Sequence, residues 1–440
     1  MNIIILGYNA VSVALATALT HEAHNVTMIS QEKRKLEHLA RHLDMRIIIG
    51  KPTFPKNLHQ ANAGESDIIL AMTEHDETNM VACQIAYSLF KIPKKIARIE
   101  STAYFAKDQL FGNANLPIDT FINPNQLIAH HIANSINERY FCHSCNIADT
   151  VCHMQMTKIG TKNPYLGELY SAWASQFEIY VPAVRRKNKL HMPTDSLICT
   201  TGDELCLIGT QHNLRAAITE LHHTYPILSN KNLMINGGNA ITEHLINQLS
   251  SHHHVKVIEP DTEVCRHLTT LNNKTMILNG SASDNRLLTE EHISDTEIFC
   301  AVTSDDEDNI LTAIQAKYLG AKQAMAIIHQ ENYLAMLQNS QLNQIISPQH
   351  LITRQVLTLT REKLLQKTLN LPWPNAELIC LPGSFLQRKI PKHHMWQICG
   401  IIHQQQWRAN QAIQSHDEHA ICFVPDSNAM KQLRAYLSKT

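Results

Sequence analysis

The sequence lacks both a charge excess and a membrane-spanning run. In 440 residues, 38 Lys and Arg stand against 39 Asp and Glu, which leaves a formal net charge of −1. A chain without a global basic field is not expected to bind nucleic acid. No stretch approaches the roughly 20 consecutive apolar residues that a membrane span requires. We therefore expect a soluble, cytoplasmic protein.

Catalytic motifs are also missing. The chain has no nucleophile elbow, no Walker lysine, no HExxH motif and no convincing pair of catalytic carboxylates. A hydride-transfer enzyme would need an acid or a base in a substrate domain, and no residue stands out for that role. The sequence therefore predicts a binding protein rather than an enzyme.

Cysteine is present without the pattern of a disulfide framework. The 11 Cys are odd in number and most lie in apolar runs, which fits reduced thiols in the cytosol. Structural zinc needs four ligands, commonly from two CxxC-like pairs, but only one CxxC occurs. We therefore expect no metal at the three groups of candidate ligands, which are residues 142–145 with 152–153, residues 252–254, and Cys265 with His267.

One stretch of the chain occurs twice. Residues 2–15 read NIIILGYNAVSVAL and residues 232–245 read NLMINGGNAITEHL. Residues 70–79 (LAMTEHDETN) and 300–309 (CAVTSDDEDN) form a second pair, and both pairs are 230 residues apart. The N-terminal run is therefore not a signal peptide, because the same pattern recurs where no signal acts. The chain is predicted to be a tandem duplication.

Each copy begins with alternating short apolar runs and amphipathic segments. In the first copy this βαβ alternation predicts a doubly wound parallel sheet. A helical connector and a small α+β module with short strands then follow, and the pattern restarts near residue 229. The predicted fold class is therefore α/β, with two Rossmann-like sheets that are each followed by an α+β module. The elements expected are strands at 3–6, 26–29, 46–49, 67–72, 95–99, 179–184 and 205–209, helices at 11–19, 32–43, 58–63, 79–90 and from 211, and connectors at 118–137 and 351–369.

The turn after the first strand is where a dinucleotide-binding fold receives the pyrophosphate. Three glycines normally form this turn, allow the phosphate to approach and allow the helix to pack. Here only the first glycine is kept, at Gly7 and Gly237. Asn9 and Asn239 take the second place, where we expect Asn to tolerate a left-handed backbone. Two interpretations stay open: a working nucleotide site, or a turn that no longer binds phosphate.

The end of the second strand normally carries an acid that binds the ribose hydroxyls. The first copy has Ser30 there, whereas the second copy has Glu259, with Asp261 nearby. By this criterion the second copy is the better NAD site. Ser30 instead leaves room for a phosphorylated ribose or another nucleotide in the first copy.

The repeated acidic motif follows the fourth strand of each copy. Thr73 and Thr303 are expected at the carboxyl edge of the sheet, close to a ligand. The acids after them are expected to act as helix caps, because carboxylates are favoured at helix N-termini; they are Asp76, Glu77, Asp306 and Glu307. Arg98, at the end of the fifth strand, is well placed to meet a phosphate, whereas its counterpart is Ile328.

These motifs together resemble the TrkA family, the peripheral RCK-domain subunits of bacterial Trk potassium uptake systems. The resemblance rests on GYNAV, GGNAI, ETNMVACQIAYSLF (residues 77–90), IARI (96–99) and GDELCLIG (202–209). It implies two RCK units, each with an N-terminal Rossmann module and a C-terminal module. The implied domains are residues 1–123, 140–225, 229–349 and a diverged last module at 368–440, where His416 stands in place of Gly202.

The resemblance also implies partners and ligands. It implies a TrkH- or TrkG-type potassium-translocating membrane subunit, a homodimer or homotetramer, and a location on the inner face of the cell inner membrane. NAD(H), and ATP or ADP, are the implied ligands. The first implied nucleotide site comprises Gly7, Tyr8, Asn9, Ala10, Val11, Ser30, Thr73, Glu74 and Arg98; the second comprises Gly237, Gly238, Asn239, Ala240, Ile241, Glu259, Thr303 and Ser304.

The sequence departs from the family pattern of Gly at positions 9 and 12 and an acid at position 30. Three functional hypotheses therefore remain. The first is a nucleotide-binding regulatory subunit of potassium uptake. The second is a diverged scaffold without nucleotide, and the third is an NAD-dependent oxidoreductase.

Overall fold

The structure is a computed structural model of the full chain. It describes residues 1–105, 110–112, 114–137, 145–148, 152–160, 163–187, 189–193, 197–222, 230–337, 340–361, 367–371, 376–382, 395–403, 406–409 and 419–437. Two compact units are present. One comprises Met1–Ile136 with Ser229–Leu357, and the other comprises Asn137–Leu228 with Thr358–Thr440. Each unit thus combines one part from each copy of the duplication.

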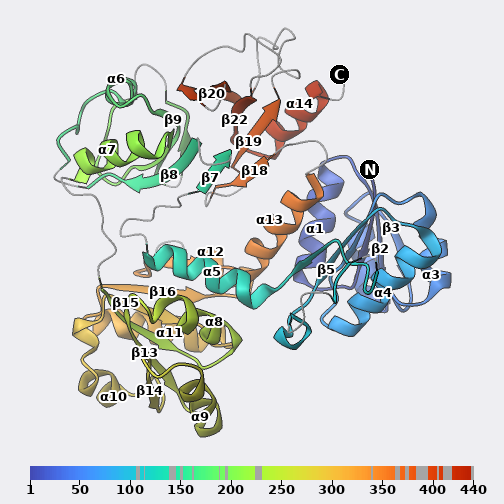
Figure 1. Ribbon diagram of the computed structural model, residues 1–440, viewed down its shortest axis with the longest axis horizontal. Coiled ribbons are helices and arrows are strands. Elements are labelled where there is room, and N and C mark those ends of the chain that lie inside the picture. Colours follow the sequence, from blue (N-terminus) through green and yellow to red (C-terminus); the bar gives the residue numbers. More distant parts are fainter. Residues whose placement is uncertain are drawn as a thin grey trace. The chain divides into compact units, whose positions relative to one another are not determined.

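The first unit begins with a six-stranded parallel sheet in the order β3-β2-β1-β4-β5-β6 (Figure 1). The order reverses between β1 and β4, so the carboxyl ends of these two strands flank a crevice. The strands are β1 (Asn2–Leu6), β2 (Asn25–Ser30), β3 (Arg46–Ile49), β4 (Ile68–Ala71), β5 (Lys94–Arg98) and β6 (Thr120–Ile122). The helices are α1 (Ala10–His21), α2 (Lys33–Ala40), α3 (Pro55–Gln60), α4 (Asp76–Phe90) and α5 (Pro124–Asn137), with short 3₁₀ turns η1 (Ala63–Glu65) and η2 (Thr102–Phe105).

The second parallel sheet repeats this order as β14-β13-β12-β15-β16-β17. Its strands are β12 (Asn232–Asn236), β13 (His254–Glu259), β14 (Met276–Asn279), β15 (Ile298–Ala301), β16 (Gln323–Ile327) and β17 (Gln344–Ile346). Its helical elements are α8 (Ala240–Leu249), α9 (Thr262–Leu271), α10 (Asn285–Glu290), η3 (Ile293–Asp295), α11 (Asp306–Tyr318), α12 (Glu331–Met336) and α13 (Pro348–Arg361). The predicted duplication of a doubly wound sheet is confirmed.

Continuous apolar runs explain the central strands. All four residues of β4 are buried, and Ile3 through Leu6 of β1 are at most 1% exposed. A parallel strand covered by helices on both faces needs such a run, because neither face meets water. By contrast, α2 buries only Leu36 and presents its charged side chains to solvent.

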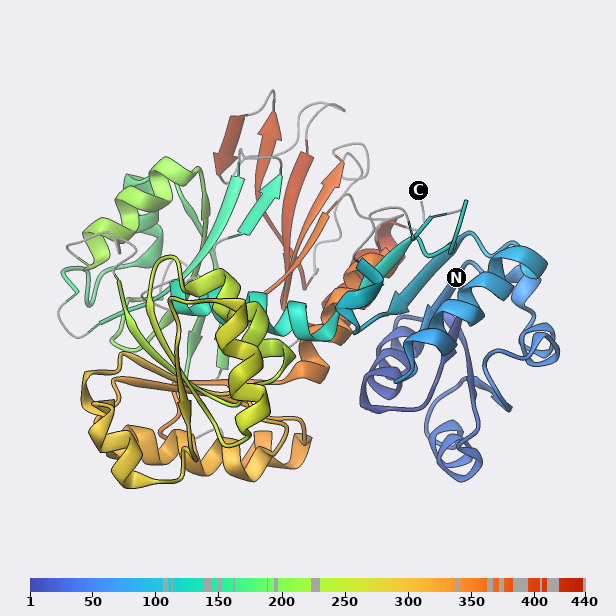
Figure 2. The same ribbon diagram turned by 60° about the horizontal axis from the view of Figure 1, so that its bottom comes forward.

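Helix α5 follows the first sheet in sequence but belongs to the core of the second. Ile128, Ile132 and Ile136 are at most 3% exposed and pack in one cluster with residues of β12, α8 and β15. The Nε2 atom of Gln344 in β17 donates to the Ser135 hydroxyl of α5 at 3.2 Å. Figures 1 and 2 both show α5 lying along the second sheet. The helix that follows the first sheet in sequence is therefore part of the core of the second module.

The prediction of a helix over 118–137 is wrong at its start, because β6 precedes α5. The matching strand β17 was also not predicted. Each has three residues and lies at the edge of its sheet, so neither is long enough to show a strand period. The second connector, expected at 351–369, is α13 at Pro348–Arg361, and β18 starts at Lys367.

The second unit contains two five-stranded antiparallel sheets. The first, in the order β10-β9-β11-β8-β7, comprises β7 (Cys145–Ala148), β8 (Cys152–Lys158), β9 (Tyr180–Arg186), β10 (Lys189–His191) and β11 (Glu204–Gly209), with α6 (Tyr170–Gln176) and α7 (Gln211–His222). The second, in the order β18-β19-β22-β20-β21, comprises β18 (Lys367–Asn370), β19 (Glu377–Pro382), β20 (Gln397–His403), β21 (Gln406–Ala409) and β22 (His419–Val424), with α14 (Ser427–Leu437).

A single hydrophobic cluster joins these two antiparallel sheets. Met154 and Ile208 from the first sheet pack in it with Leu378 and Phe423 from the second. Nine of the described cysteines are buried and free of disulfides: Cys83, Cys152, Cys199, Cys206, Cys265, Cys300, Cys380, Cys399 and Cys422. Burial raises the pKa of the Cys83 thiol to about 12, so this thiol stays protonated at neutral pH.

The GDEL motif of residues 202–205 forms a buried polar network. The Asp203 carboxylate accepts hydrogen bonds from Arg186 Nε at 2.8 Å, from Arg186 Nη2 at 2.7 Å, from the Tyr170 hydroxyl and from the Thr200 N–H at 3.0 Å. Burial alone opposes ionisation, but the bonds from Arg186, Tyr170 and Thr200 hold the pKa of Asp203 below its ordinary value. The echo of this motif around His416 lies outside the described residues.

Within the described residues, no helix combines the length and the apolar character needed to span a membrane.

Candidate nucleotide sites

The candidate site of each Rossmann module lies at the carboxyl ends of its first and fourth strands. Gly7 has φ +96°, and a Cβ added there would lie 3.0 Å from Thr73 Cγ2 and 3.1 Å from Thr73 Cα. Gly237 has φ +109° and the same close approach to Thr303. Only glycine combines this backbone conformation with so little space. The first glycine of each turn is thus required by the fold, whether or not a ligand binds.

Asn9 is the N-cap of α1, and its backbone is extended, with φ −147° and ψ 177°. Asn9 does not adopt the left-handed backbone that we expected, so that explanation for an Asn at this place in the turn is wrong. Its Oδ1 accepts the Ser12 N–H at 2.9 Å, and its Nδ2 donates to the Met72 carbonyl at 2.6 Å. The side chain both caps the helix and ties it to the end of β4.

Asn239 repeats this arrangement in the second module. Its Oδ1 accepts the N–H groups of Ile241 and Thr242, at 3.0 and 3.2 Å, and its Nδ2 donates to the Val302 carbonyl. The first four N–H groups of a helix have no partner within the helix. The Asn9 side chain accepts one of these groups in α1, that of Ser12, whereas the Asn239 side chain accepts two in α8, so the cap of α1 leaves more N–H groups open.

The third position of the turn differs between the modules. Thr242 donates its hydroxyl to the Gly237 carbonyl and is fully buried. Ser12 is also fully buried, but its hydroxyl has no hydrogen-bond partner among the described residues. A buried unpartnered hydroxyl costs free energy. The first module therefore keeps an unpartnered polar group beside the glycine turn.

The ends of the second strands differ in charge. Ser30 is 5% exposed, and its hydroxyl accepts the Glu32 N–H at 3.3 Å. The Glu259 carboxylate accepts the Gly238 N–H at 2.6 Å and the Asp261 N–H at 2.8 Å. Glu259 therefore already contacts the glycine turn, as an acid that binds a ribose near the pyrophosphate would.

Thr73 and Thr303 lie at the expected sheet edge, but their hydroxyls are used internally. Asn79 Oδ1 accepts both the Thr73 hydroxyl at 2.7 Å and the Thr73 N–H at 3.0 Å. Asn79 Nδ2 donates to the carbonyls of Thr73 and Arg98, each at 2.9 Å. Asn309 makes the same four bonds around Thr303 and Ile327. These two Asn residues were not predicted, although both end the repeated ten-residue motif.

The acids after these threonines do not cap their own helices, which corrects that prediction. Asp76 accepts the N–H groups of Glu100 and Ser101 in the loop after β5. Asp306 binds the corresponding loop after β16 through three groups, which are the N–H and the ring Nδ1 of His329 and the N–H of Gln330. They therefore fix the loops at the carboxyl edge of the sheet.

The glutamates of this motif also bind side chains beyond the fifth strand. Glu77 accepts the Tyr104 hydroxyl at 2.7 Å, and Glu307 accepts the Tyr333 hydroxyl. The N-cap of α11 is Asp305, whose carboxylate accepts the Asp308 N–H at 2.9 Å. The first turn of each helix is thus part of the rim of the candidate site.

Arg98 ends β5, and its guanidinium pairs with Glu100. Its Nε atom is buried without a hydrogen-bond partner among the described residues. The residue at the same place in the second module is Ile327, which ends β16, accepts from Asn309 as Arg98 accepts from Asn79, and is fully buried; the predicted counterpart Ile328 is therefore wrong by one residue. Glu74 and Ser304 are exposed on the loops beside the turns. The fifth strand thus ends in a cation in the first module and in an apolar residue in the second.

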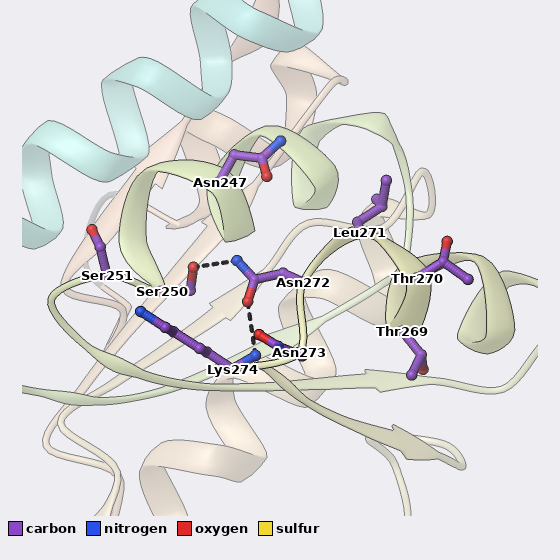
Figure 3. Close-up of a pocket in the computed structure, with 9 residues that line it drawn as sticks. All are labelled: Asn247, Ser250, Ser251, Thr269, Thr270, Leu271, Asn272, Asn273 and Lys274. Carbon is purple, nitrogen blue, oxygen red and sulfur yellow. Dashed lines mark hydrogen bonds between the residues drawn. The ribbon is translucent and has the colours of Figure 1, made fainter.

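A pocket of about 450 Å³ lies elsewhere, at the opposite edge of the second sheet (Figure 3). Its lining is mostly polar and comes from the C-terminal ends of α8 and α9 and the segments after them, including Ser250, Asn272 and Lys274. Asn272 Nδ2 donates to the Ser250 hydroxyl at 2.7 Å. These residues precede β13 and β14, whereas Gly237 follows β12, so the pocket is separate from the candidate nucleotide site.

The described residues contain no group of three or more potential metal ligands. Cys142 and His143 lie outside the described residues. His253 is buried and its Nδ1 accepts the Lys231 N–H at 3.2 Å, whereas His267 lies beside Glu243 at 3.1 Å. These side chains have structural partners of their own.

A family model described as the TrkA-N domain matches residues 3–124 and again residues 233–348. The chain belongs to the TrkA family. The Trk system potassium uptake protein TrkA of Halomonas elongata is 33% identical over 364 residues, covering 82% of this chain and 79% of that protein. The Trk system potassium uptake protein TrkA of Haemophilus influenzae is 35% identical over 357 residues, which cover 79% of this chain and 77% of that protein. The family expected from the sequence is confirmed.

Solved structures show the same fold. The GsuK channel bound to NAD aligns over 100% of this chain and 79% of the channel chain, with a TM-score of 0.65 and 14% sequence identity. The crystal structure of the GsuK RCK domain aligns over 100% and 95% of the two chains, with a TM-score of 0.63 and 15% identity. The arrangement of two Rossmann modules and two antiparallel modules is therefore that of tandem RCK domains, and this TrkA-family chain is an RCK protein of potassium uptake.

Proposed function

We propose that the chain is the nucleotide-responsive regulatory subunit of a Trk-type potassium uptake system. In this role it docks on the cytoplasmic face of a TrkH- or TrkG-type membrane subunit as a homodimer or homotetramer. Nucleotide bound in the Rossmann modules shifts the assembly between two arrangements, and the assembly biases the potassium pathway. It is a regulator and catalyses no reaction.

The observation that carries this proposal is the preserved carboxyl edge of both modules. Each keeps the glycine turn, the helix cap at Asn9 or Asn239 and the rim fixed by Asp76 or Asp306. In the second module the Glu259 carboxylate lies 2.6 Å from the Gly238 N–H, where it can accept ribose hydroxyls. The NAD-bound GsuK channel has the same fold and supports a dinucleotide as the ligand.

A second candidate is a scaffold that docks without nucleotide, and a specific observation favours it. The Asn caps and the Glu259 carboxylate already use N–H groups of the turns that a pyrophosphate would otherwise bind. A phosphate must therefore replace these contacts or use the remaining N–H groups. Binding measurements separate the two functions.

The test is calorimetric titration of the full-length protein with NADH, NAD, ATP and ADP. The matched variants are Glu259→Ala and, as a control, Glu290→Ala, which removes an exposed acid at the C-terminal end of α10. We expect saturable NADH binding that weakens about tenfold or more in Glu259→Ala, because a lost hydrogen bond to a charged group costs about 1.5–3 kcal/mol. Glu290→Ala should bind as wild type does.

Absence of binding for all four nucleotides would refute the regulatory proposal and select the scaffold. Deletion of the gene provides the cellular test: we expect loss of Trk-dependent growth at low potassium. Unimpaired potassium uptake would contradict both functions. Steady consumption of NADH with a carbonyl substrate would instead select an oxidoreductase.

A further inference from the structure

The two modules carry opposite charge where the ribose of a bound dinucleotide would lie. In the first module, residues 30–35 include three cations, Lys33, Arg34 and Lys35, and one acid, Glu32. The structural counterparts in the second module, residues 259–264, include three acids and no cation: Glu259, Asp261 and Glu263. Strand register and helix caps align the segments, because β2 and β13 end at Ser30 and Glu259, and Glu32 and Asp261 are the N-caps of α2 and α9.

The first of these segments is locally unfavourable without a ligand. Helix α2 has no acid in its first turn, and its N-cap Glu32 makes no side-chain capping bond. Three cations therefore lie at the positive end of the helix dipole, where anions are favoured. Violations of local preference of this kind are typical of functional sites. A bound anion would offset the repulsion between the three cations and the positive end of the α2 dipole.

Lys35 connects this basic segment to the glycine turn. Its ammonium lies 5.7 Å from the centroid of the Tyr8 ring, and Tyr8 directly follows Gly7. Lys35 also pairs with Glu32 at 3.1 Å, but both side chains are more than half exposed, so water screens this pair and a phosphate can replace it. Lys51, which follows β3 beside Ser30, is also exposed. Its counterpart is Ser281, which carries no charge.

Ser30 and Ser12 supply the polar groups that such a ligand needs. The Ser30 hydroxyl lies at the end of β2, where an acid would repel a phosphate on the ribose. The Ser12 hydroxyl is buried beside the turn and has no partner among the described residues. A serine with nearby cations in place of the acid suits a 2′-phosphorylated ribose, and an acid suits free ribose hydroxyls.

We propose that the first Rossmann module selects a dinucleotide with a 2′-phosphate on its adenosine ribose, such as NADPH, while the second selects the unphosphorylated form. This inference deepens the proposed function and rests on it. Ser30 and Lys35 bind the 2′-phosphate, with Lys33 and Arg34 adding positive charge. The protein then reports on two separate nucleotide pools rather than one.

The experiment is calorimetric titration of the full-length protein with NADPH and, separately, with NADH. We expect one NADPH site per chain that is about tenfold or more tighter for NADPH than for NADH in 0.1 M salt, since one charge-assisted hydrogen bond accounts for such a factor. The preference should shrink as salt rises to 0.5 M, because the cations are exposed.

Three variants locate the site. Lys35→Glu should bring the affinities for NADPH and NADH close to parity, and Ser30→Glu should favour NADH. The control Arg41→Glu reverses a charge at the far end of the same helix and should keep the preference. Thermal unfolding checks folding, because Ser30 is buried; if Ser30→Glu does not fold, the exposed Lys35→Glu decides.

Equal affinities in the wild type, or a preference that survives Lys35→Glu, would overturn the inference. In either case saturable NADH binding leaves the proposed function intact. If neither dinucleotide bound, the inference would be overturned, and the proposed function would then depend on binding of ATP or ADP. If those did not bind either, the proposed function would be refuted as well. If NADPH binding were lost in Glu259→Ala but kept in Lys35→Glu, NADPH would bind in the second module, and the inference would be refuted.

Discussion

Replacement of Asn79 by Ala tests the link that holds the edge of the first candidate site together. The Asn79 side chain is fully buried and makes four hydrogen bonds, two with the backbone of Thr73, one with its hydroxyl and one with the Arg98 carbonyl. After truncation the Thr73 hydroxyl can still donate to the His75 carbonyl at 3.2 Å. Three backbone groups lose their partners: the Thr73 N–H, the Thr73 carbonyl and the Arg98 carbonyl.

The expected cost is roughly 3 kcal/mol, because each buried unsatisfied group costs about 1–3 kcal/mol and we take about 1 for each. Amide hydrogen exchange is the suitable assay, since a chain with several modules does not unfold in one step. The peptides that cover β4, α4 and β5 should exchange roughly 100-fold faster, as about 1.4 kcal/mol corresponds to a factor of ten.

Two comparisons make this result specific. Gln84→Ala on the same helix removes one exposed hydrogen bond, to Ser88 at 2.8 Å, and should change exchange little. Asn309→Ala should accelerate exchange in β15, α11 and β16 instead. If Asn79→Ala exchanged no faster than Gln84→Ala, the four hydrogen bonds would not stabilise this edge and the reasoning would fail.

Two further changes test the turn and the GDEL motif. Gly7→Ala should destabilise the protein by about 2 kcal/mol or more, because φ is positive at Gly7 and Thr73 lies 3.0 Å from the new Cβ. The control Gly64→Ala should change the stability little, because no atom lies within 4 Å of its new Cβ. Urea unfolding measures both variants. Asp203→Asn should cost about 3 kcal/mol by breaking a buried ion pair, against little for Glu204→Gln. Because the pKa of Asp203 is depressed in the folded state, the ionised carboxylate stabilises the fold above pH ~4, and this stabilisation is lost as the pH falls further. The urea midpoints of wild type and Asp203→Asn should therefore converge in acid. A difference between the midpoints that does not change with pH would contradict the reasoning.

The fold was largely predictable because the chain contains its own comparison. A buried strand followed by Gly7 is a weak signal alone, but the same signal at Gly237, followed at equal distance by the second motif, specifies a repeated βαβ unit. The strands β6 and β17 escaped prediction because three edge residues bury too little to impose a period. The boundaries 1–123, 140–225, 229–349 and 368–440 remain predictions, and the structure adds that α5 packs in the core of the second module.

The candidate site was predictable in its location but not in its contacts. Parallel strands bring Gly7, Thr73 and Arg98 to one edge, which the order of motifs already indicated. The pairing of each Asn with a particular N–H or carbonyl depends on side-chain torsions that no spacing encodes. Hence Asn9 was interpreted by its backbone preference, although its role is a cap, and Asn79 was overlooked.

The duplication separates the residues that build the site from those that select its ligand. The building contacts are the same in both halves: an Asn caps the first helix, a second Asn holds the threonine, and an Asp fixes the far loop. The segment after the second strand differs in charge, because Ser30 and Lys35 in the first half correspond to Glu259 and Val264 in the second. Packing cannot require this change, because Lys35 and Glu259 reach solvent. A difference in charge at this segment, beside contacts that both halves share, is what the proposed pair of sites with different ligands requires.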